Sequence, residues 1–143
     1  MTNQQSISID SGLKSIPISV DGKNVHELEF DTNDLLFIKK LHAIYFEAKQ
    51  KVVELQEAEK QKPEVDENGM IVDFEQIKIQ TEEINIWFKE KIDNLIGDGS
   101  SQKIFGNKIY SNPSVYVQLI NGLFEIVGLD REPKVAKYVK KQK

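Results

Sequence analysis

Side chains able to do chemistry are few in this chain and widely spaced. The only two histidines, His26 and His42, have no carboxylate at a spacing that would complete a metal site with them. Serine hydrolysis requires a serine on a sharp turn with a base within hydrogen-bond reach, and the motif Gly-x-Ser-x-Gly does not occur. We therefore interpret both histidines as structural or solvated, and we predict no catalytic residue, no metal ligand and no cofactor-binding residue.

The remaining candidates are two carboxylate pairs, Glu82 with Glu83 and Glu64 with Asp66, and one glycine-containing loop at residues 97–103. The carboxylates stand in ordinary charged surroundings, which favours a solvated surface over acid–base catalysis. Glycines ahead of a helix can cradle phosphate on free backbone amides. This loop lacks the Gly-Lys-Ser/Thr ending and the preceding strand of a phosphate loop, so we interpret it as a turn and helix cap. We predict that the protein is not an enzyme.

The composition is that of a small folded protein. At 143 residues, with 39% apolar and 29% charged residues, the chain fits one domain with a modest core. Cysteine is absent, which excludes disulfides and favours a reducing compartment. The first residues have no signal-peptide pattern, and no apolar run approaches the ~20 residues of a membrane span. We expect a cytoplasmic protein that does not enter membranes.

The net charge of −4 is unevenly distributed along the chain. Residues 131–143 contain six Lys or Arg residues and one Glu, a charge of +5, which leaves −9 on residues 1–130. Because an acidic body repels phosphates, we expect no nucleic-acid binding by the folded domain. We interpret the basic segment as a solvated tail, with an acidic protein partner or RNA as the alternative ligands.

Near the N-terminus, the sequence predicts a β-hairpin. Apolar and polar residues alternate from Ile16 to Val20, and a second apolar run extends from Val25 to Phe30. Asp21-Gly22 between them is a strong hairpin signal, because both residue types tolerate the backbone angles of a tight turn. Pro17 has no amide hydrogen, so its strand should lie at a sheet edge.

Two long helices are predicted after the hairpin. Side chains at residues 31–34 can cap the first helix, which runs to about Lys62, where Pro63 stops it. The second helix begins near Asp73 and ends at residues 97–99, where two glycines flank an aspartate. A short connection between them makes the two helices antiparallel neighbours.

A short helical turn and a third helix complete the predicted fold. The turn covers residues 100–105, and residues 111–113, Ser-Asn-Pro, form a strong helix start. The third helix is expected to end at Gly128, with Pro133 beyond it. We therefore predict a mainly α protein (α+β) with a small N-terminal β-hairpin, a long antiparallel helical hairpin and a third, C-terminal helix. The predicted divisions are a flexible N-terminus at 1–13, one domain at 14–128 and a flexible basic tail at 129–143.

Both long helices carry an apolar seam at spacings of three and four residues, which keeps one stripe of side chains facing a neighbouring helix. The seam of the first helix contains Ile38, Leu41, Tyr45, Ala48, Val52 and Leu55. That of the second contains Phe74, Ile77, Thr81, Ile84, Phe88 and Leu95, interrupted at Lys91. The third helix has a broad apolar face at Tyr116, Leu119, Ile120, Leu123, Phe124 and Val127.

The second helix has a further apolar stripe at Val72, Ile79 and Ile86, which are seven residues apart and lie off the main seam. Such a stripe requires a cover. We interpret the third helix as that cover, with a protein partner as the alternative. Trp87 adjoins the stripe in sequence. Val72, Ile79, Ile86 and Trp87 are therefore the candidate residues for partner binding or self-association.

The segment from Ile92 to Gly106 ends a helix, passes through Gly-Asp-Gly and two serines, and closes with Phe-Gly. Asn112-Pro113 and an apolar helix follow it, and residues 30–34, Phe-Asp-Thr-Asn-Asp, lead into the first long helix. This order resembles the tail assembly chaperones of long-tailed phages and prophages of Gram-positive hosts. The resemblance covers about residues 14–127 and contains no catalytic signature.

The resemblance implies a non-enzymatic protein of the host cytoplasm that binds the tape measure protein, keeps it soluble and promotes tail tube assembly. The tail tube protein and further copies of this chain are additional candidate partners. One alternative is a structural virion component, such as a connector or tail completion protein. Another is a regulatory module that binds protein or nucleic acid through the basic tail.

Overall fold

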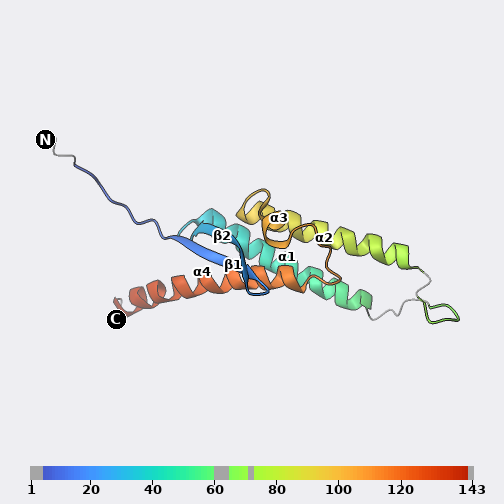
Figure 1. Cartoon of the computed structure of the whole chain (residues 1–143). Coiled ribbons are helices and arrows are strands. Elements are labelled where there is room, and N and C mark those ends of the chain that lie inside the picture. The colour runs from blue at the N-terminus through green and yellow to red at the C-terminus, as the bar shows by residue number, and fades with distance from the viewer. Residues whose placement is uncertain (1–4, 60–64, 71–72, 142–143) are drawn as a thin grey trace.

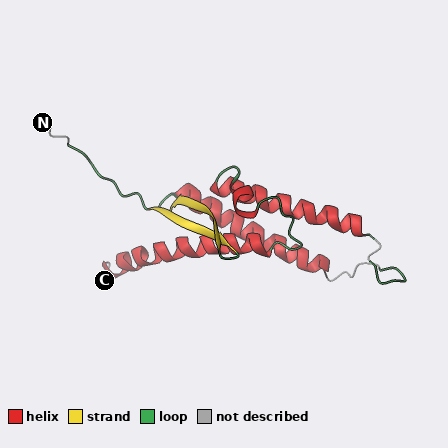
Figure 2. Cartoon of the chain, viewed as in Figure 1, coloured by secondary structure: helices red, strands yellow, loops and turns green. Residues whose placement is uncertain are grey.

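The computed structural model describes residues 5–59, 65–70 and 73–141. Within these residues the protein is mainly helical with an N-terminal β-hairpin, which confirms the predicted fold class (Figure 2). The elements are β1 (Leu13–Val20), β2 (Lys23–Asp31), α1 (Leu35–Glu59), α2 (Phe74–Ile96), α3 (Ser100–Phe105) and α4 (Ser114–Lys141). No helix among the described residues is long and apolar enough to cross a membrane.

The predicted hairpin is confirmed, with β1 and β2 paired antiparallel. Asp21 and Gly22 both have positive φ angles, of 53° and 81°, as the tight turn of a two-residue hairpin loop requires. Leu28 and Phe30 of β2 are buried in the core, while the isoleucines of β1 are half-buried. The described sheet has two strands, so Pro17 lies on an edge strand as predicted.

The three long helices lie side by side, with α1 packed against both α2 and α4 (Figure 1). α2 and α4 each run antiparallel to α1. The short helix α3 contacts α2 and both strands. The hairpin therefore closes one side of the helical layer, and α1 is the element that the other two long helices share.

Local capping contacts set the helix ends. The Asp34 carboxylate accepts a hydrogen bond from the Leu36 amide at 3.0 Å, and the Asp31 carboxylate accepts one from the Asn33 amide at 2.8 Å. These bonds satisfy amides that have no partner within the first turn of a helix. Gly97, at φ 113°, ends α2. The predicted end of the first helix, near Lys62 and Pro63, lies outside the described residues.

The core is formed by the seam faces of the helices and by β2. In α1 the prediction is confirmed at Ile38, Leu41 and Ala48, and the structure adds Phe37 and Ile44 as buried residues. In α2 the prediction is confirmed at Phe88 and Leu95, whereas Ile77, Thr81 and Ile84 are half-buried. The buried residues of α2 are Asn85, Phe88, Ile92 and Leu95.

Two positions of the predicted α2 seam differ from expectation. Phe74 was predicted to be in the seam but is exposed, because the first turn of α2 lies at the free end of the helical layer (Figure 1). Lys91 does not interrupt the packing, because the neighbouring Ile92 occupies the core instead. Successive side chains of a helix point about 100° apart, so Lys91 and Ile92 face different sides of α2 and only Ile92 faces the core.

The predicted end of the last helix is wrong, because α4 continues through Gly128 and Pro133 to Lys141. Glycine and proline inside a helix cost about 1 and 3 kcal/mol relative to alanine. Here the helix is already nucleated by the packed turns from Tyr116 to Val127, and extending a formed helix is far easier than starting one. The predicted division at residue 128 thus falls inside a helix, and the flexibility of residues 129–143 stays a prediction.

Candidate protein-binding site

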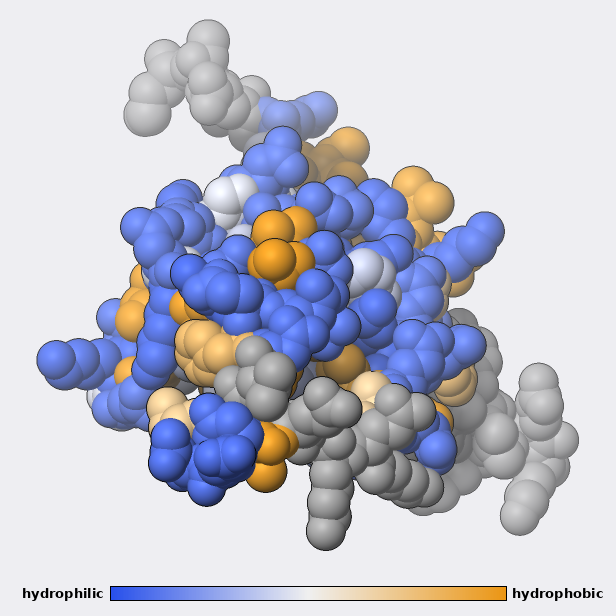
Figure 3. Space-filling model, turned by 90° about the vertical axis from the view of Figure 1, so that its right-hand side faces the viewer, coloured by the Kyte–Doolittle hydropathy of each residue, from blue (hydrophilic) through white to orange (hydrophobic). Residues whose placement is uncertain are grey.

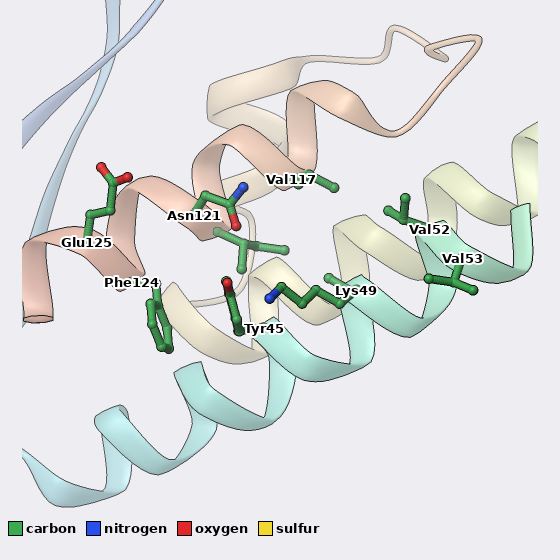
Figure 4. Close-up of a pocket in the computed structure, with 10 residues that line it drawn as sticks. Tyr45, Lys49, Val52, Val53, Val117, Asn121, Phe124 and Glu125 are labelled. Atoms are coloured by element: carbon green, nitrogen blue, oxygen red, sulfur yellow. The ribbon is translucent and has the colours of Figure 1, made fainter. Parts of the chain in front are cut away.

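An open apolar groove lies between α1 and α4, with a volume of about 480 Å³ (Figure 4). Each helix contributes residues at i, i+3, i+4, i+7 and i+8, the spacing of one helical face. We call it the α1–α4 groove. It is lined by Tyr45, Ala48, Lys49, Val52 and Val53 of α1 and by Val117, Ile120, Asn121, Phe124 and Glu125 of α4.

Aromatic stacking closes one end of the α1–α4 groove. The rings of Tyr45 and Phe124 are nearly parallel, at 16°, with their centroids 4.1 Å apart. The His42 ring lies 4.9 Å from the same phenylalanine ring. Beyond this stack the two helices present mainly aliphatic side chains, and Figure 4 shows Val52 and Val117 facing the space between them. The groove therefore has a fixed aromatic end and an aliphatic floor.

The polar side chains of the groove lie at its rim and carry opposite charges. The Lys49 ammonium lies 4.6 Å from the centroid of the Tyr45 ring, a cation–π distance. On the opposite wall, α4 supplies Asn121 and Glu125 (Figure 4). An apolar floor between two helices with a few charges at the edges matches the way amphipathic helices dock in grooves.

Exposed apolar side chains extend the groove along the outer surface of α1. Phe46 and Val53, seven residues apart, are 62% and 55% exposed. At the end of the molecule where α1 finishes and α2 begins, by contrast, apolar side chains are separated by polar ones (Figure 3). Phe46 and Val53 therefore add exposed apolar surface to α1 at the groove.

The predicted stripe on α2 is not covered by the C-terminal helix, so that interpretation is wrong. Ile79 and Ile86 are 47% and 55% exposed. The core-facing side of α2 contains Asn85 and Phe88, and Ile79 and Ile86 lie on a different side of the helix because of their spacing. Val72 lies outside the described residues. A protein partner as the cover of Ile79 and Ile86 stays a prediction.

Trp87 is half-buried and joins α2 to α1. Its ring meets Phe88 edge-on at 4.8 Å between centroids, and the ammonium groups of Lys51 and Lys91 each lie 5.4 Å from its ring centroid. Lys91 also forms a 2.7 Å ion pair with Glu47 of α1. The structure thus gives Trp87 a packing role between α2 and α1, and its part in partner binding stays a prediction.

A buried polar cluster in the core was not predicted. The Asn85 side chain donates hydrogen bonds to the carbonyls of Thr81 and Tyr110 at 2.8 and 2.9 Å. It accepts one from the Tyr110 amide at 2.9 Å and one from the Tyr116 hydroxyl. Burial, and secondarily the neighbouring Tyr110, raises the pKa of Tyr116 to about 12. The hydroxyl is therefore a neutral donor that ties α4 to α2, and the Tyr110 backbone ties the segment before α4 to the same Asn85 side chain.

The other candidate groups that the structure describes are not gathered into one cluster, and Glu64 lies outside the described residues. His26 lies on β2 opposite Ile18, far in sequence from His42, which stacks on α4. In the described part of the chain, no three His, Asp or Glu residues form a cluster able to hold a metal ion. The Ser101 amide at the start of α3 donates to the Asp93 carboxylate at 2.8 Å, which gives that amide a partner within the chain.

Comparison with known proteins places this architecture in a family. A family model described as a family of unknown function (DUF6673) matches residues 24–143, which is most of the chain. The chain belongs to the DUF6673 family. No curated protein and no solved structure matches it. The matched region of this DUF6673 protein contains the whole α1–α4 groove, together with Ile79 and Ile86 of α2, whereas β1 lies outside the match.

Proposed function

We propose that this DUF6673 protein is a tail assembly chaperone that binds the tape measure protein, keeps it soluble and promotes tail tube assembly. The observation that carries the proposal is the open apolar α1–α4 groove, continued by the exposed Phe46 and Val53. The order of sequence signals from Phe30 to Pro113, which resembles these chaperones, supports the same function. The protein would act in the host cytoplasm.

The physical basis of the proposal is the shielding of apolar helical surface. A tape measure protein is long and helical and exposes apolar seams before the tail tube encloses it. A helix with apolar residues at heptad positions can bury them between two antiparallel helices. The aliphatic floor of the α1–α4 groove supplies the apolar contacts, while Lys49 and Glu125 at the rim can pair with charges beside the seam.

Ile79 and Ile86 on α2 offer a second, smaller contact surface. They are flanked in sequence by Glu82, Glu83 and Glu90, so this surface favours an amphipathic segment with basic flanks. The α1–α4 groove is larger and carries both charge signs. We therefore assign the main contact to the groove and an auxiliary contact to the α2 isoleucines.

The test is co-expression with the tape measure protein, scored by the fraction of that protein that remains soluble. Phe46→Lys and Val53→Lys change exposed side chains, so both variants should fold normally while abolishing most of the solubilisation. Ile109→Lys is the matched control, because Ile109 is similarly exposed but lies in the segment between α3 and α4. Equal solubilisation by the native chain and both groove variants would refute the groove as the binding site.

A second measurement separates a chaperone from a structural virion component. A chaperone is expected in infected cells and absent from purified virions, whereas a connector or tail completion protein would be found in both. Binding to the tape measure protein in solution together with absence from virions supports the proposal. Stoichiometric presence in virions contradicts it.

A further inference from the structure

The N-terminal arm, residues 5–12, extends away from the folded body ahead of β1 (Figure 1). Ile7 and Ile9 alternate with polar residues, the pattern of a strand with one apolar face. Their side chains are 91% and 84% exposed. The arm therefore presents two apolar side chains to solvent, and its own chain does not bury them.

Hydrogen bonds hold the base of the arm against the start of α1. The Gly12 carbonyl accepts from the amide and the hydroxyl of Thr32, both at 3.3 Å, and Asn33 donates to the Ser11 carbonyl at 2.6 Å. A Cβ atom at Gly12 would collide with the Asn33 side chain. These contacts tie residues 11 and 12 to the turn between β2 and α1, and the residues before them extend beyond it.

A second apolar groove, of about 440 Å³, lies between β1 and α4. We call it the β1–α4 groove. In the described sheet β1 pairs with β2 along one edge only, so its other edge has no strand neighbour. The groove is lined by residues 16–21 of the hairpin, by Ile104 and Phe105 of α3, and by Val115, Gln118, Leu119, Gly122, Leu123 and Ile126 of α4.

Gly122 makes a notch in the wall of the β1–α4 groove. It lies inside α4, where glycine is less favourable than alanine. A Cβ atom added there would meet nothing within 4 Å, so packing within the chain does not require glycine at this position. The position leaves room for a side chain that approaches α4 from outside.

We propose that the arm of a second copy docks in the β1–α4 groove, with Ile7 and Ile9 packed against β1 and α4 over Gly122. This inference goes beyond the proposed function and uses a different surface. From Gly12 to Ile7 an extended arm reaches about 16 Å. Exchange of the two arms gives a twofold-symmetric dimer in which each chain supplies one arm and one groove.

The contact between the arm and the β1–α4 groove is apolar, which determines how dimerisation should respond to salt and to substitution of the isoleucines. Pro17 in β1 has no amide hydrogen, so the isoleucine side chains, and not a complete strand ladder, carry the association. The segment from Gln5 to Ile9 carries no charged side chain. Dimerisation should therefore change little with salt concentration, because screening acts on charges, and should weaken about tenfold or more for each isoleucine replaced by serine.

Cross-linking tests where the arm docks, and the cysteine-free chain allows selective pairs. Ile7→Cys and Ile9→Cys, each combined with Leu119→Cys, should form disulfide-linked dimers on mild oxidation. Ser8→Cys with Leu119→Cys is the matched control, because Ser8 points to the opposite side of an extended arm. A disulfide within one chain would overturn the second copy as occupant. Cross-linking no faster than in the control would overturn the docking.

Sedimentation of the full chain tests the dimer independently. The native protein should be dimeric, and the variant with both Ile7→Ser and Ile9→Ser monomeric with unchanged circular dichroism. Gly122→Leu should also weaken the dimer, while Gly128→Leu, at a helical glycine with the same open space but outside the groove, should not. A monomeric native protein would overturn arm exchange and leave the α1–α4 groove proposal unaffected.

Discussion

Replacing Asn85 by alanine should destabilise the protein strongly, because this residue satisfies several buried polar groups at once. The substitution removes the partners of the Tyr110 amide and carbonyl and of the Tyr116 hydroxyl. A buried donor without a partner costs about 1–3 kcal/mol. Tyr116 is fully buried, whereas Tyr110 is half-buried and water can reach it. We expect a loss of about 2–4 kcal/mol in the free energy of unfolding.

The double variant, Asn85→Ala with Tyr116→Phe, separates the loss at the Tyr116 hydroxyl from the other losses. Tyr116→Phe alone should cost about 0.5–1.5 kcal/mol, since it removes one hydrogen bond and Asn85 keeps its bond from the Tyr110 amide. In the Asn85→Ala background the same substitution removes a buried hydroxyl that has lost its partner. There it should recover the part of the stability that was lost at the Tyr116 hydroxyl, because replacing both partners of a hydrogen bond by apolar groups is nearly neutral.

Urea unfolding measures these free energies, with the fluorescence of Trp87 as the probe, since the chain contains one tryptophan. Asn94→Ala is the matched control on the exposed side of α2 and should change stability by less than about 0.5 kcal/mol. A loss below about 1 kcal/mol for Asn85→Ala would refute the reasoning. If the losses in the free energy of unfolding from Asn85→Ala and Tyr116→Phe simply add in the double variant, the two side chains are not coupled as expected.

Three further predictions concern ionisation, helix extent and a surface ion pair. The pKa of Tyr116 is raised from 10.0 to about 12 in the folded protein, so this side chain ionises first in the unfolded chain. The free energy of unfolding should therefore fall as pH rises from 10 to 12. Urea unfolding at several pH values should show this fall, and it should be smaller in Tyr116→Phe. Ala136→Pro should lower far-ultraviolet helical circular dichroism, since residue 136 lies inside α4 and a further proline breaks a helix. No decrease would contradict a helix through this position. Glu47→Gln should lower the free energy of unfolding in urea by less than about 1 kcal/mol, because its ion pair with Lys91 is partly exposed. A larger loss would contradict the weak contribution expected of a partly exposed ion pair.

The features that could be predicted from sequence are those determined by neighbouring residues. The hairpin turn at Asp21-Gly22 and the cap at Asp34 depend on backbone angles and on hydrogen bonds across two residues. Both are local physical preferences that hold in any fold. The same applies to the break at Gly97, where a positive φ angle ends α2.

The groove could not be predicted, although its residues were recognised as apolar. Tyr45 and Val52 belong to the predicted seam of the first helix, and Phe124 to the apolar face of the third. Helical period identifies a face but leaves open which neighbouring helix packs on it and at what offset. Here α4 covers only part of the α1 face, so these residues line an open groove instead of a closed core.

The polar cluster at Asn85 was missed for a related reason. The predicted α2 seam passes on either side of Asn85, through Thr81, Ile84 and Phe88. From the sequence alone, Asn85 is a polar residue between two seam positions, and nothing in the pattern shows that it is buried. Its partners lie 25 and 31 residues further along the chain, a separation that local pattern does not encode.

The central position of α1 also affects the order in which the protein can fold during synthesis. Its core residues Leu41 and Ile44 emerge early, but α4, which packs against α1, ends its core-forming part only at Val127. At the usual synthesis rate of about 5–20 residues per second, α1 waits roughly 4–15 s for that partner. During this interval α2 can already pack on α1 and α3 on the hairpin, while the side of α1 that α4 will cover remains open to other proteins in the cell.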